Sequence, residues 1–505
     1  MEQPREQQHI PAVNEPVRPF FHRRPVCLAA LGVFIGLICF SLFGAPGAGA
    51  AGAGVGLLIL LLLLLAALWL YRPALLPLLF AVLAFFSAAL QCPSMPEQTE
   101  GYLTGRVAEP PEHAAASTVL VLKDAALNGV PIHGRVEVIV HGGANAEYGR
   151  QIGVSASLQP SDADWLAYDR SLCIAAHADV SASDLSYGNV ERDAYGVLLD
   201  VRAAVAERIG ALFPAHPDVA SALLLGSRLS RMDAEILSQF RAAGIAHLLA
   251  VSGLHVGILA AALLLLLRLI RPLWLRFSAF LALLAAYAAL TAFTPSVLRA
   301  SIMLLCVLPA APLRRRPDLP SSLSLAFVLV LLAQPFALGT AGFQLSFAAM
   351  LGLTLLAPVL RVPFSVLGDR AATSLSGSIA VLVSTIPPIA SFFGKLPLAS
   401  VAANLIILPL LPLFLIPAAA VLPLSCLSLP LGRAIAVLPA AALDLLLRVA
   451  EAGGSPQLQL LPPSPLGTVL FYAAMLFASP LFLARPRARA LCSGLCAAAC
   501  LLFWH

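Results

Sequence analysis

Residues 54–71, which read GVGLLILLLLLLAALWLY, decide the fold class of this chain, because they contain no charged side chain and are nearly continuous in leucine. A helix rising 1.5 Å per residue needs ~20 apolar residues to cross the hydrocarbon of a membrane, and this stretch comes close to that length. Two more apolar runs flank it, at residues 26–44 and 73–91. A polar arm of about 25 residues precedes them, which favours retained membrane helices over a removable signal peptide.

The composition of the whole chain supports the same interpretation. Hydrophobic residues make up 60% of the 505 residues and charged residues 11%, whereas soluble domains have about a quarter charged residues. We therefore predict an α-helical polytopic membrane protein with about 10–13 membrane helices, some of them re-entrant or interfacial. The later apolar runs lie near residues 244–270, 273–293, 297–312, 321–337, 339–358, 374–394, 398–425, 433–450, 465–484 and 488–504.

A polar region interrupts the apolar pattern and reads as a small β domain. Its short, Val-rich, alternating stretches are separated by Gly, Asn and Pro turns, and about five such strands can close an OB-like barrel. An amphipathic helix over residues 196–212 leads back to the membrane. The chain thus divides into 1–92 (arm and three membrane helices), 93–218 (β domain and connecting helix) and 219–505 (helical membrane domain). The expected strands cover residues 101–107, 118–123, 135–141 and 152–158.

Loop charges indicate how the chain is oriented in its membrane. Arginines are frequent before the first apolar run, whereas residues 44–53 carry no charge. Because cytoplasmic loops are enriched in Lys and Arg, the N-terminus is expected in the cytoplasm and residues 93–218 outside it. The side of the C-terminus depends on whether 433–450 crosses the membrane or 398–425 is a broken pair. Asp444 and Arg448 make 433–450 equally consistent with an interfacial amphipathic helix.

Residues 244–257, GIAHLLAVSGLHVG, place polar side chains inside an expected span. Ser252 and His255 are three residues apart and would share a helix face, and Gly253 permits close helix contact. A histidine in an apolar span marks a transport pathway or is hydrogen-bonded to a neighbouring helix for structure alone, and the two alternatives have equal weight. Arg299, four residues after Pro295, is open to the same two interpretations, as a pathway residue or as a side chain that snorkels to the interface.

The segment 244–257 resembles the signature of the ComEC-type competence family, with its G-I-x-H-L-L-A-x-S-G-L-H core. Further matches follow in family order over most of the chain: TPSVLRAS at 294–301, Arg316 to Asp318 with Leu323 to Ala326, GFQLSF at 342–347, Phe393-Gly394, and Ala403 to Leu405. The resemblance implies a channel that translocates single-stranded DNA into the cytoplasm during natural transformation, with the OB-like domain receiving the strand outside.

The resemblance also implies a set of functional residues and partners. The implied partners are single-stranded DNA, membrane lipid and separate DNA-receptor, nuclease and motor proteins. A separate motor is needed because the chain lacks a G-x-x-x-x-G-K-[ST] loop. A homo-oligomer is also compatible with the sequence. If the β domain receives DNA, its candidate stacking aromatics are Tyr102, Trp165 and Tyr168. The candidate pore or signature residues are Arg228, Ser252, Gly253, His255, Ser296, Arg299, Asp318, Gln344, Ser346 and Asn404.

Two features depart from the family pattern. The H-x-H-x-D-H motif of the metallo-β-lactamase-like domain in longer members is not found, and His141, His177 and Asp179 read as solvated loop residues rather than zinc ligands. We therefore expect no catalytic residue, metal or cofactor, and no nuclease activity in this chain. Residues 93–218 also contain eight Lys and Arg against seventeen Asp and Glu, which disfavours nonspecific attraction to phosphates.

These departures keep alternative functions open. A transporter of another solute on the same fold, without a competence role, is the main rival. A membrane-embedded enzyme has little support, because no nucleophile has a nearby base. Cys92 and Cys173 lie near the oxidising side of the membrane, which permits a disulfide, although Cys92 at the membrane end of its helix argues against one.

Overall fold

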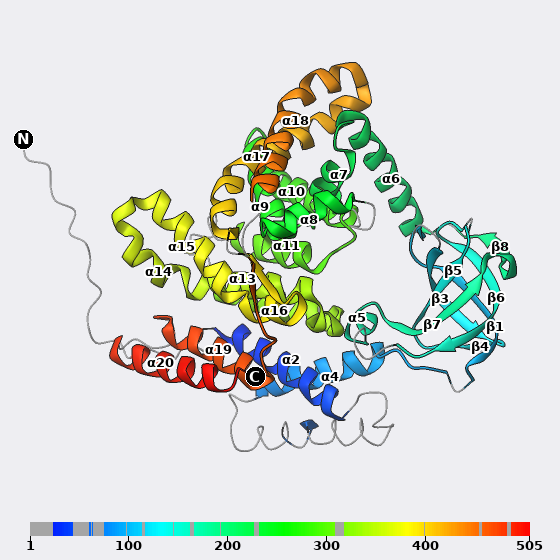
Figure 1. The fold of residues 1–505 in the computed structure, drawn as a ribbon, viewed down its shortest axis with the longest axis horizontal. Helices are drawn as coiled ribbons and strands as arrows, with labels where there is room; N and C mark the ends of the chain where they lie inside the picture. The colour runs from blue at the N-terminus through cyan, green and yellow to red at the C-terminus, as the bar shows by residue number, and fades with distance from the viewer. Residues whose placement is uncertain are drawn as a thin grey trace, which may run out of the picture.

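The computed structural model shows a helical body with a β domain on one side (Figure 1). Most of the opening stretch 54–71 lies outside the described residues, as do Arg228 and Trp165. The structure describes residues 24–43, 60–61, 63, 75–96, 98–113, 117–144, 146–161, 166–191, 193–226, 232–308, 318–397, 399–453, 457–481 and 486–504.

The first two described helices pack through glycine. α2 (Pro25–Phe43) lies along α4 (Leu75–Gln91). A Cβ atom at Gly32 would lie 1.9 Å from the carbonyl oxygen of Pro77, and one at Gly36 would lie 2.1 Å from that of Ala81. This G-x-x-x-G spacing brings the two backbones into direct contact, as is common between membrane helices.

Five strands of the β domain close into a barrel-like sheet. The ladder runs β1-β3-β5-β7-β6 and returns to β1 through a β1–β6 pairing, and only β5–β7 among these pairs is parallel. Alternate residues of each strand point into a core of Leu, Val and Ala side chains. The five strands are β1 (Glu100–Val107), β3 (Ser117–Leu127), β5 (Arg135–His141), β6 (Arg150–Gln159) and β7 (Ile174–Ser181), and the short strands are β2 (Glu112–His113), β4 (Val130–Pro131) and β8 (Ser186–Val190).

A polar network attaches helix α6 (Ala194–Leu212) to this barrel. The Asp193 carboxylate accepts hydrogen bonds from the Gly196 backbone N–H (2.8 Å), the Tyr148 hydroxyl and Lys123 Nζ (3.1 Å). The Gly196 N–H at the start of the helix, followed by the Tyr148 hydroxyl, lowers the pKa of Asp193 to about 2. The acceptor therefore stays ionised over the physiological range, and it fixes the start of the helix that returns to the helical body.

The helical body consists of two long apolar helices and many shorter ones. Among the described residues, α10 and α17 are long and apolar enough to cross a membrane, and two bent pairs raise this number to up to 4. The predicted 10–13 membrane helices therefore stay a prediction. The helices are α7 (Pro217–Leu225), α8 (Ala234–Ala242), α9 (Gly253–Leu267), α10 (Leu273–Leu290), α11 (Pro295–Val307), α12 (Leu319–Ala333), α13 (Ala341–Leu355), α14 (Ala357–Phe364), α15 (Asp369–Ser384), α16 (Ile386–Phe392), α17 (Ser400–Leu427), α18 (Leu429–Ala452), α19 (Pro465–Ala478) and α20 (Pro486–Leu502).

Several expected spans are divided differently from the sequence prediction. The run 244–270 is not one helix, because Gly244 adopts φ +73° and the chain makes a short 3-10 turn, η4 (Ala246–Leu248), before α9. The apolar run 374–394 bends by 46° between α15 and α16. By contrast, α17 (Ser400–Leu427), which covers most of the expected span 398–425, is one continuous helix of 28 residues in spite of four internal prolines. Polar caps and glycine conformations, rather than hydrophobicity, set these boundaries.

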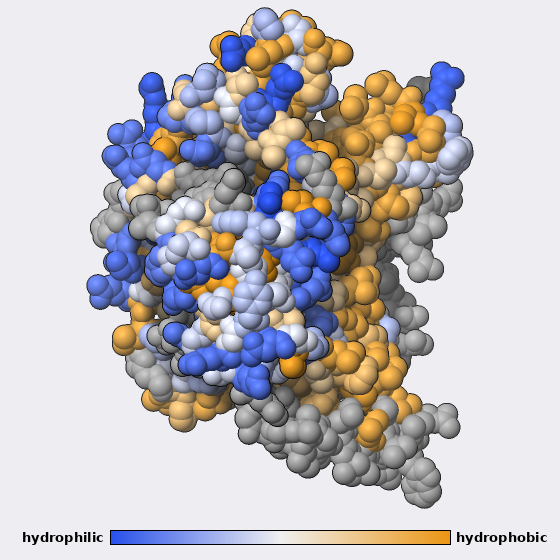
Figure 2. All heavy atoms as spheres, turned by 90° about the vertical axis from the view of Figure 1, so that its right-hand side faces the viewer, coloured by the Kyte–Doolittle hydropathy of each residue, from blue (hydrophilic) through white to orange (hydrophobic). Residues whose placement is uncertain are grey.

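The surface separates into the two kinds expected of a membrane protein with an outer domain. Figure 2 shows hydrophilic side chains gathered over the β domain, which faces the viewer, and hydrophobic ones over the helices beside it. Trp274 and Leu283 on α10 are 71% and 48% exposed. Exposed apolar side chains on this scale mark a surface that contacts lipid or another protein.

Candidate functional site

The signature histidine lies at the start of α9. Ser252 is the residue immediately before the helix. Its backbone N–H donates to His255 Nδ1 (3.3 Å), and its hydroxyl lies 2.9 Å from the same nitrogen. Since Nδ1 accepts the backbone N–H, the proton of a neutral ring is assigned to Nε2. The His255 side chain is fully buried, and Nε2 has no hydrogen-bond partner among the described residues.

Arg299 lies one helix away, on α11, and is 5% exposed. Its Nε donates to Ser346 Oγ on α13 (2.8 Å), and its guanidinium carbon lies 5.8 Å from the centre of the Phe347 ring. A Cβ atom at Gly253 would lie 2.4 Å from the guanidinium, so glycine makes room for the arginine. No carboxylate pairs with Arg299 in the part of the chain that the structure describes.

Predicted residues from three separate stretches of sequence therefore meet at one place. Gly253 of α9 contacts Arg299 of α11, which binds Ser346 of α13. Ser252 and His255 lie on the first turn of the same helix α9. We call Ser252, Gly253, His255, Arg299 and Ser346 the arginine–histidine cluster.

Unsatisfied polar atoms concentrate around this cluster. Of the seven buried side-chain nitrogen and oxygen atoms without a partner in the described residues, four lie between residues 253 and 307. Sequence reasoning named only His255 among them, although two others fall within the quoted motif 294–301. Because buried polar groups are normally hydrogen-bonded, such a concentration points to water or a ligand between these helices. The four atoms are His255 Nε2, Tyr287 OH, Thr294 Oγ1 and Ser301 Oγ.

The other predicted signature residues do not join the cluster. Asp318 caps α12 and makes a double hydrogen bond with Arg24 (Nε–Oδ2 2.8 Å, Nη2–Oδ1 2.8 Å), which indicates a structural role. Gln344 donates to the Leu338 carbonyl (2.9 Å) and so holds the turn before α13. Ser296 and Asn404 are half-buried on α11 and α17.

His177, predicted to be a solvated loop residue, lies on β7 between two carboxylates, so that prediction is wrong. Nδ1 lies 3.2 Å from Glu137 on β5, and Nε2 lies 2.9 Å from Asp169 on α5 (Leu166–Ser171). These acceptors, Glu137 first, raise the pKa of His177 to about 9. His141 and Asp179, also assigned to loops, are strand residues 3.4 Å apart at the surface. Strands β5 and β7 pair in parallel, and their register brings the residues of both pairs together.

The candidate aromatics and cysteines have different surroundings. The Tyr102 hydroxyl bonds to Ser186 (2.7 Å) and covers Gly153, whose Cβ would meet it at 2.2 Å, so this ring stabilises the sheet. The side chain of Tyr168 lies outside the described residues. Cys92 and Cys173 are free in this structure.

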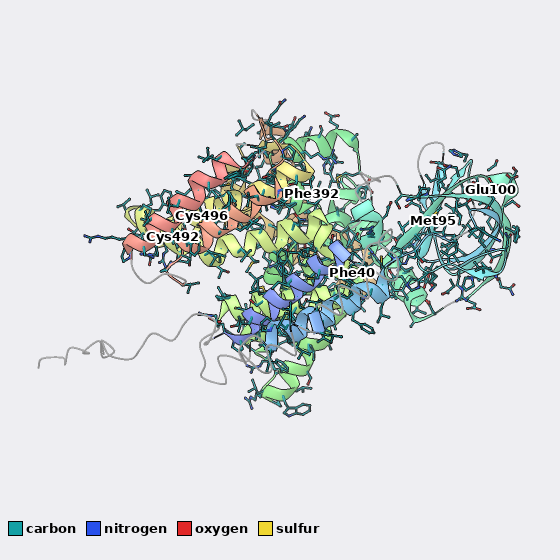
Figure 3. All side chains as sticks on the ribbon, turned by 90° about the horizontal axis from the view of Figure 1, so that it is seen from below. Phe40, Met95, Glu100, Phe392, Cys492 and Cys496 are labelled. Atoms are coloured by element: carbon teal, nitrogen blue, oxygen red, sulfur yellow. The ribbon has the colours of Figure 1, made fainter. Side chains whose placement is uncertain are left out.

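Potential metal ligands do not group in the described part of the chain. No group of three or more His, Cys, Asp or Glu side chains there could hold a metal ion. Cys492 and Cys496 lie on α20, at the opposite end of Figure 3 from Met95 and Glu100 of the β domain. On the same helix, Cys500 Sγ lies 3.4 Å from the Gly467 carbonyl oxygen of α19.

Comparison with known proteins identifies the family. The sequence profile described as "Competence protein" matches residues 223–485, which contain the whole arginine–histidine cluster, and the chain belongs to this family. With its apolar helices, it is a membrane protein.

A curated relative extends this result. The chain is 33% identical over 207 residues to "ComE operon protein 3" of Bacillus subtilis (strain 168). The match covers 41% of this chain and 26% of that protein, so it spans about a quarter of the relative's length. No solved structure matches the chain significantly.

Proposed function

We propose that this protein takes part in DNA uptake for transformation, as the channel through which single-stranded DNA crosses the bacterial inner membrane. Membership of the competence family and the similarity to a ComE operon protein support the role in DNA uptake. The channel role goes further and is supported by the arginine–histidine cluster.

The observation that carries the channel role is the buried, unpaired charge of Arg299. Removing a cation from water without a carboxylate partner is costly, and ionisable side chains at membrane depth are retained mainly where they line pathways. The hydrogen bond to Ser346 and the contact with the Phe347 ring stabilise the guanidinium group but supply no negative charge. A passing phosphate would supply the missing anion, and the Nε2–H of His255 would donate a hydrogen bond without adding a fixed charge.

The outer domain fits a strand-receiving role through its topology. Its strand order, with one parallel pair, is that of a five-stranded Greek-key barrel, the class that includes the OB folds. Its acidic balance means that attraction to DNA comes from local features rather than from the whole surface. In this arrangement the N-terminus is cytoplasmic and residues 93–218 are extracytoplasmic. A nuclease and a motor are supplied by other proteins.

Uptake assays in a deletion strain test this proposal. Cells lacking the chain are supplied with the wild type, His255→Ala or His141→Ala, and labelled DNA protected inside the cytoplasm is measured together with the amount of protein in the membrane. We expect no protected DNA in the deletion strain, at least about a tenfold loss with His255→Ala, in keeping with a lost ionic or polar contact of ~1.4 kcal/mol or more, and normal uptake with His141→Ala.

The same assay separates the rival function. A deletion strain that takes up and recombines DNA at the wild-type frequency would show that the chain has no competence role, and would leave transport of another solute as the interpretation of the buried Arg299. If the deletion strain loses DNA uptake but the His255→Ala variant restores it fully, the competence role stands and the histidine is not part of the pathway.

A further inference from the structure

A cavity of about 810 Å³ lies between the barrel and the helical body. Its volume is within the ~300–1,000 Å³ range of ligand pockets. One wall is formed by the barrel, with Glu109 and Arg135, and a second by α6, with Tyr195 and Arg202. The floor is formed by the turn 291–295 between α10 and α11. The cavity thus lies where the outer domain meets the start of the helix that carries Arg299.

Backbone strain concentrates on this cavity. Among the described residues, five that are not glycine have positive φ, and Cys173, Ala292 and Phe293 of these five line the cavity. The other two, Asp124 and Asn128, belong to residue types that tolerate this conformation in turns. Ala292 (φ +55°) and Phe293 (φ +51°) are consecutive. Such conformations are unfavourable for residues with a Cβ atom and cluster at functional sites.

The strained turn after α10 leaves the aromatic ring of Phe293 partly exposed. The backbone N–H of Phe293 donates to the Ala288 carbonyl (2.8 Å), which ends α10 and points the next residues toward the cavity. The Phe293 side chain is 42% exposed. Since the ring is not buried in the core, its packing within this chain does not offset the strain, whereas a planar ligand stacked on it would.

The charges of the lining indicate the class of ligand. Among the described residues, Arg135 and Arg202 line the cavity together with one carboxylate, Glu109, which lies 3.0 Å from Arg135. Arg202 Nη2 also donates to the carbonyls of Leu225 (3.3 Å) and Gly226 (3.2 Å). The remaining lining side chains are neutral. A local positive balance in a region with an excess of Asp and Glu is the combination that proteins use for single strands, with cations for the phosphates and aromatic rings for the bases.

The cavity also borders the start of the helix that carries Arg299 of the arginine–histidine cluster. Phe293 precedes Thr294 and Pro295, where α11 begins, and both of these line the cavity. Arg299 lies four residues further along the helix, about 6 Å along its axis at 1.5 Å per residue. A strand whose base rests on Phe293 would therefore meet the buried arginine next.

We propose that this cavity is the vestibule that passes single-stranded DNA from the barrel to the helices, with Phe293 stacking on a base and Arg135 and Arg202 contacting phosphates. This inference rests on the proposed function of the chain. It assigns Phe293 a direct contact with the nucleic acid.

Photo-cross-linking tests this contact in the full-length protein reconstituted in lipid nanodiscs. The probe is a single-stranded oligodeoxynucleotide that contains 5-iodouracil, with mass-spectrometric mapping of the adducts and a titration of binding. We expect a cross-link at Phe293 and a fivefold or larger weakening of binding in Phe293→Leu, since stacking of about 1 kcal/mol or more per base corresponds to that factor. Phe293→Trp should bind at least as tightly as the wild type.

The matched control is Phe277→Leu. Phe277 is 41% exposed on α10, the helix that precedes Phe293, but does not line the cavity, and its replacement should leave binding unchanged. Wild-type binding by Phe293→Leu, or adducts mapped only elsewhere, would overturn the vestibule contact.

The deletion strain separates this failure from failure of the proposed function. If DNA uptake is lost on deletion but restored fully by Phe293→Leu, the stacking contact alone is wrong. If uptake is normal without the chain, the proposed function is wrong as well. Loss of both cross-link and uptake in Phe293→Leu, with protein level and uptake retained in Phe277→Leu, supports the vestibule.

Discussion

The barrel and the helical body treat buried charge in opposite ways. In the barrel, the part-buried His177 lies between Glu137 and Asp169. In the helical body, Arg299 has a hydroxyl, a thioether and an aromatic ring as its partners, and His255 Nε2 has none among the described residues.

This difference distinguishes groups that hold the structure from groups that are available to a substrate. A charged side chain whose partner is part of the same protein stabilises the fold, and its hydrogen bonds are already used within that pair. A buried charge without one lowers stability and persists where function needs it. The barrel is thus expected to lose stability when its polar groups are replaced, and the helical body to lose function.

The largest stability effect is expected at His177. His177→Leu leaves Glu137 and Asp169 facing each other without the cation, and removing one partner of a buried pair typically costs about 3 kcal/mol or more. Hydrogen exchange of the β5 and β7 amides, measured on the full-length protein in nanodiscs, reports the free energy of local opening.

The control for this variant is His141→Leu, which breaks a surface pair whose side chains are 64% and 52% exposed. It should change the opening free energy by less than about 0.5 kcal/mol. Equal effects of the two variants would show that the burial of the His177 pair has no special role in the barrel.

A smaller effect, on the order of 2 kcal/mol, is expected from pH. The folded-state pKa of His177 is raised to about 9 by Glu137 and Asp169, while Ser161 also faces the ring. Because the pKa is raised, the stabilisation is complete below about pH 6.5 and is lost as the pH rises through 9. Because 23% of the His177 side chain is exposed, solvent screens part of its interaction with the two carboxylates and keeps this free energy below that of the full pKa change. Protection of β7 that does not change between pH 6.5 and 9.5 in the wild type would contradict the pairing.

The smallest effect is expected at the strained turn between the two regions. Ala292→Gly removes the Cβ atom from a residue at φ +55° and should stabilise the protein by about 1 kcal/mol. The control, Ala289→Gly, lies within α10 and should destabilise by a similar amount, because glycine is unfavourable in a helix. Both are measured by thermal unfolding in nanodiscs, and a loss of stability in both variants would show that the turn is unstrained.

Much of the fold could be predicted from local patterns. Four strands expected at 101–107, 118–123, 135–141 and 152–158 lie within β1, β3, β5 and β6, and α6 begins two residues before the expected 196. β7 was missed, because its alternation is carried by alanines rather than by Val or Ile. The helix boundaries near Gly244 and Ser252 were also missed, because the apolar run continues through residues whose backbone leaves the helix.

The site was harder to predict than the fold. Sequence reasoning named Gly253, Arg299 and Ser346 separately, but their meeting depends on how α9, α11 and α13 pack, which no local pattern specifies. The pairing of His177 depends on the register of β5 with β7. No sequence pattern pointed to Phe293, because its conformation and exposure depend on the turn after α10.

Arg299→Leu, compared with Arg299→Lys and the wild type, tests most directly whether the buried arginine serves a pathway rather than the fold. DNA uptake and thermal unfolding are measured on the same membranes. We expect uptake to fall at least about tenfold with leucine, a lost contact of ~1.4 kcal/mol or more, and less with lysine, which keeps the charge without the planar fork. The unfolding temperature of Arg299→Leu should be unchanged or higher, because an unpaired buried cation is removed. Normal uptake with a lowered unfolding temperature would show that Arg299 supports the fold and would contradict the pathway.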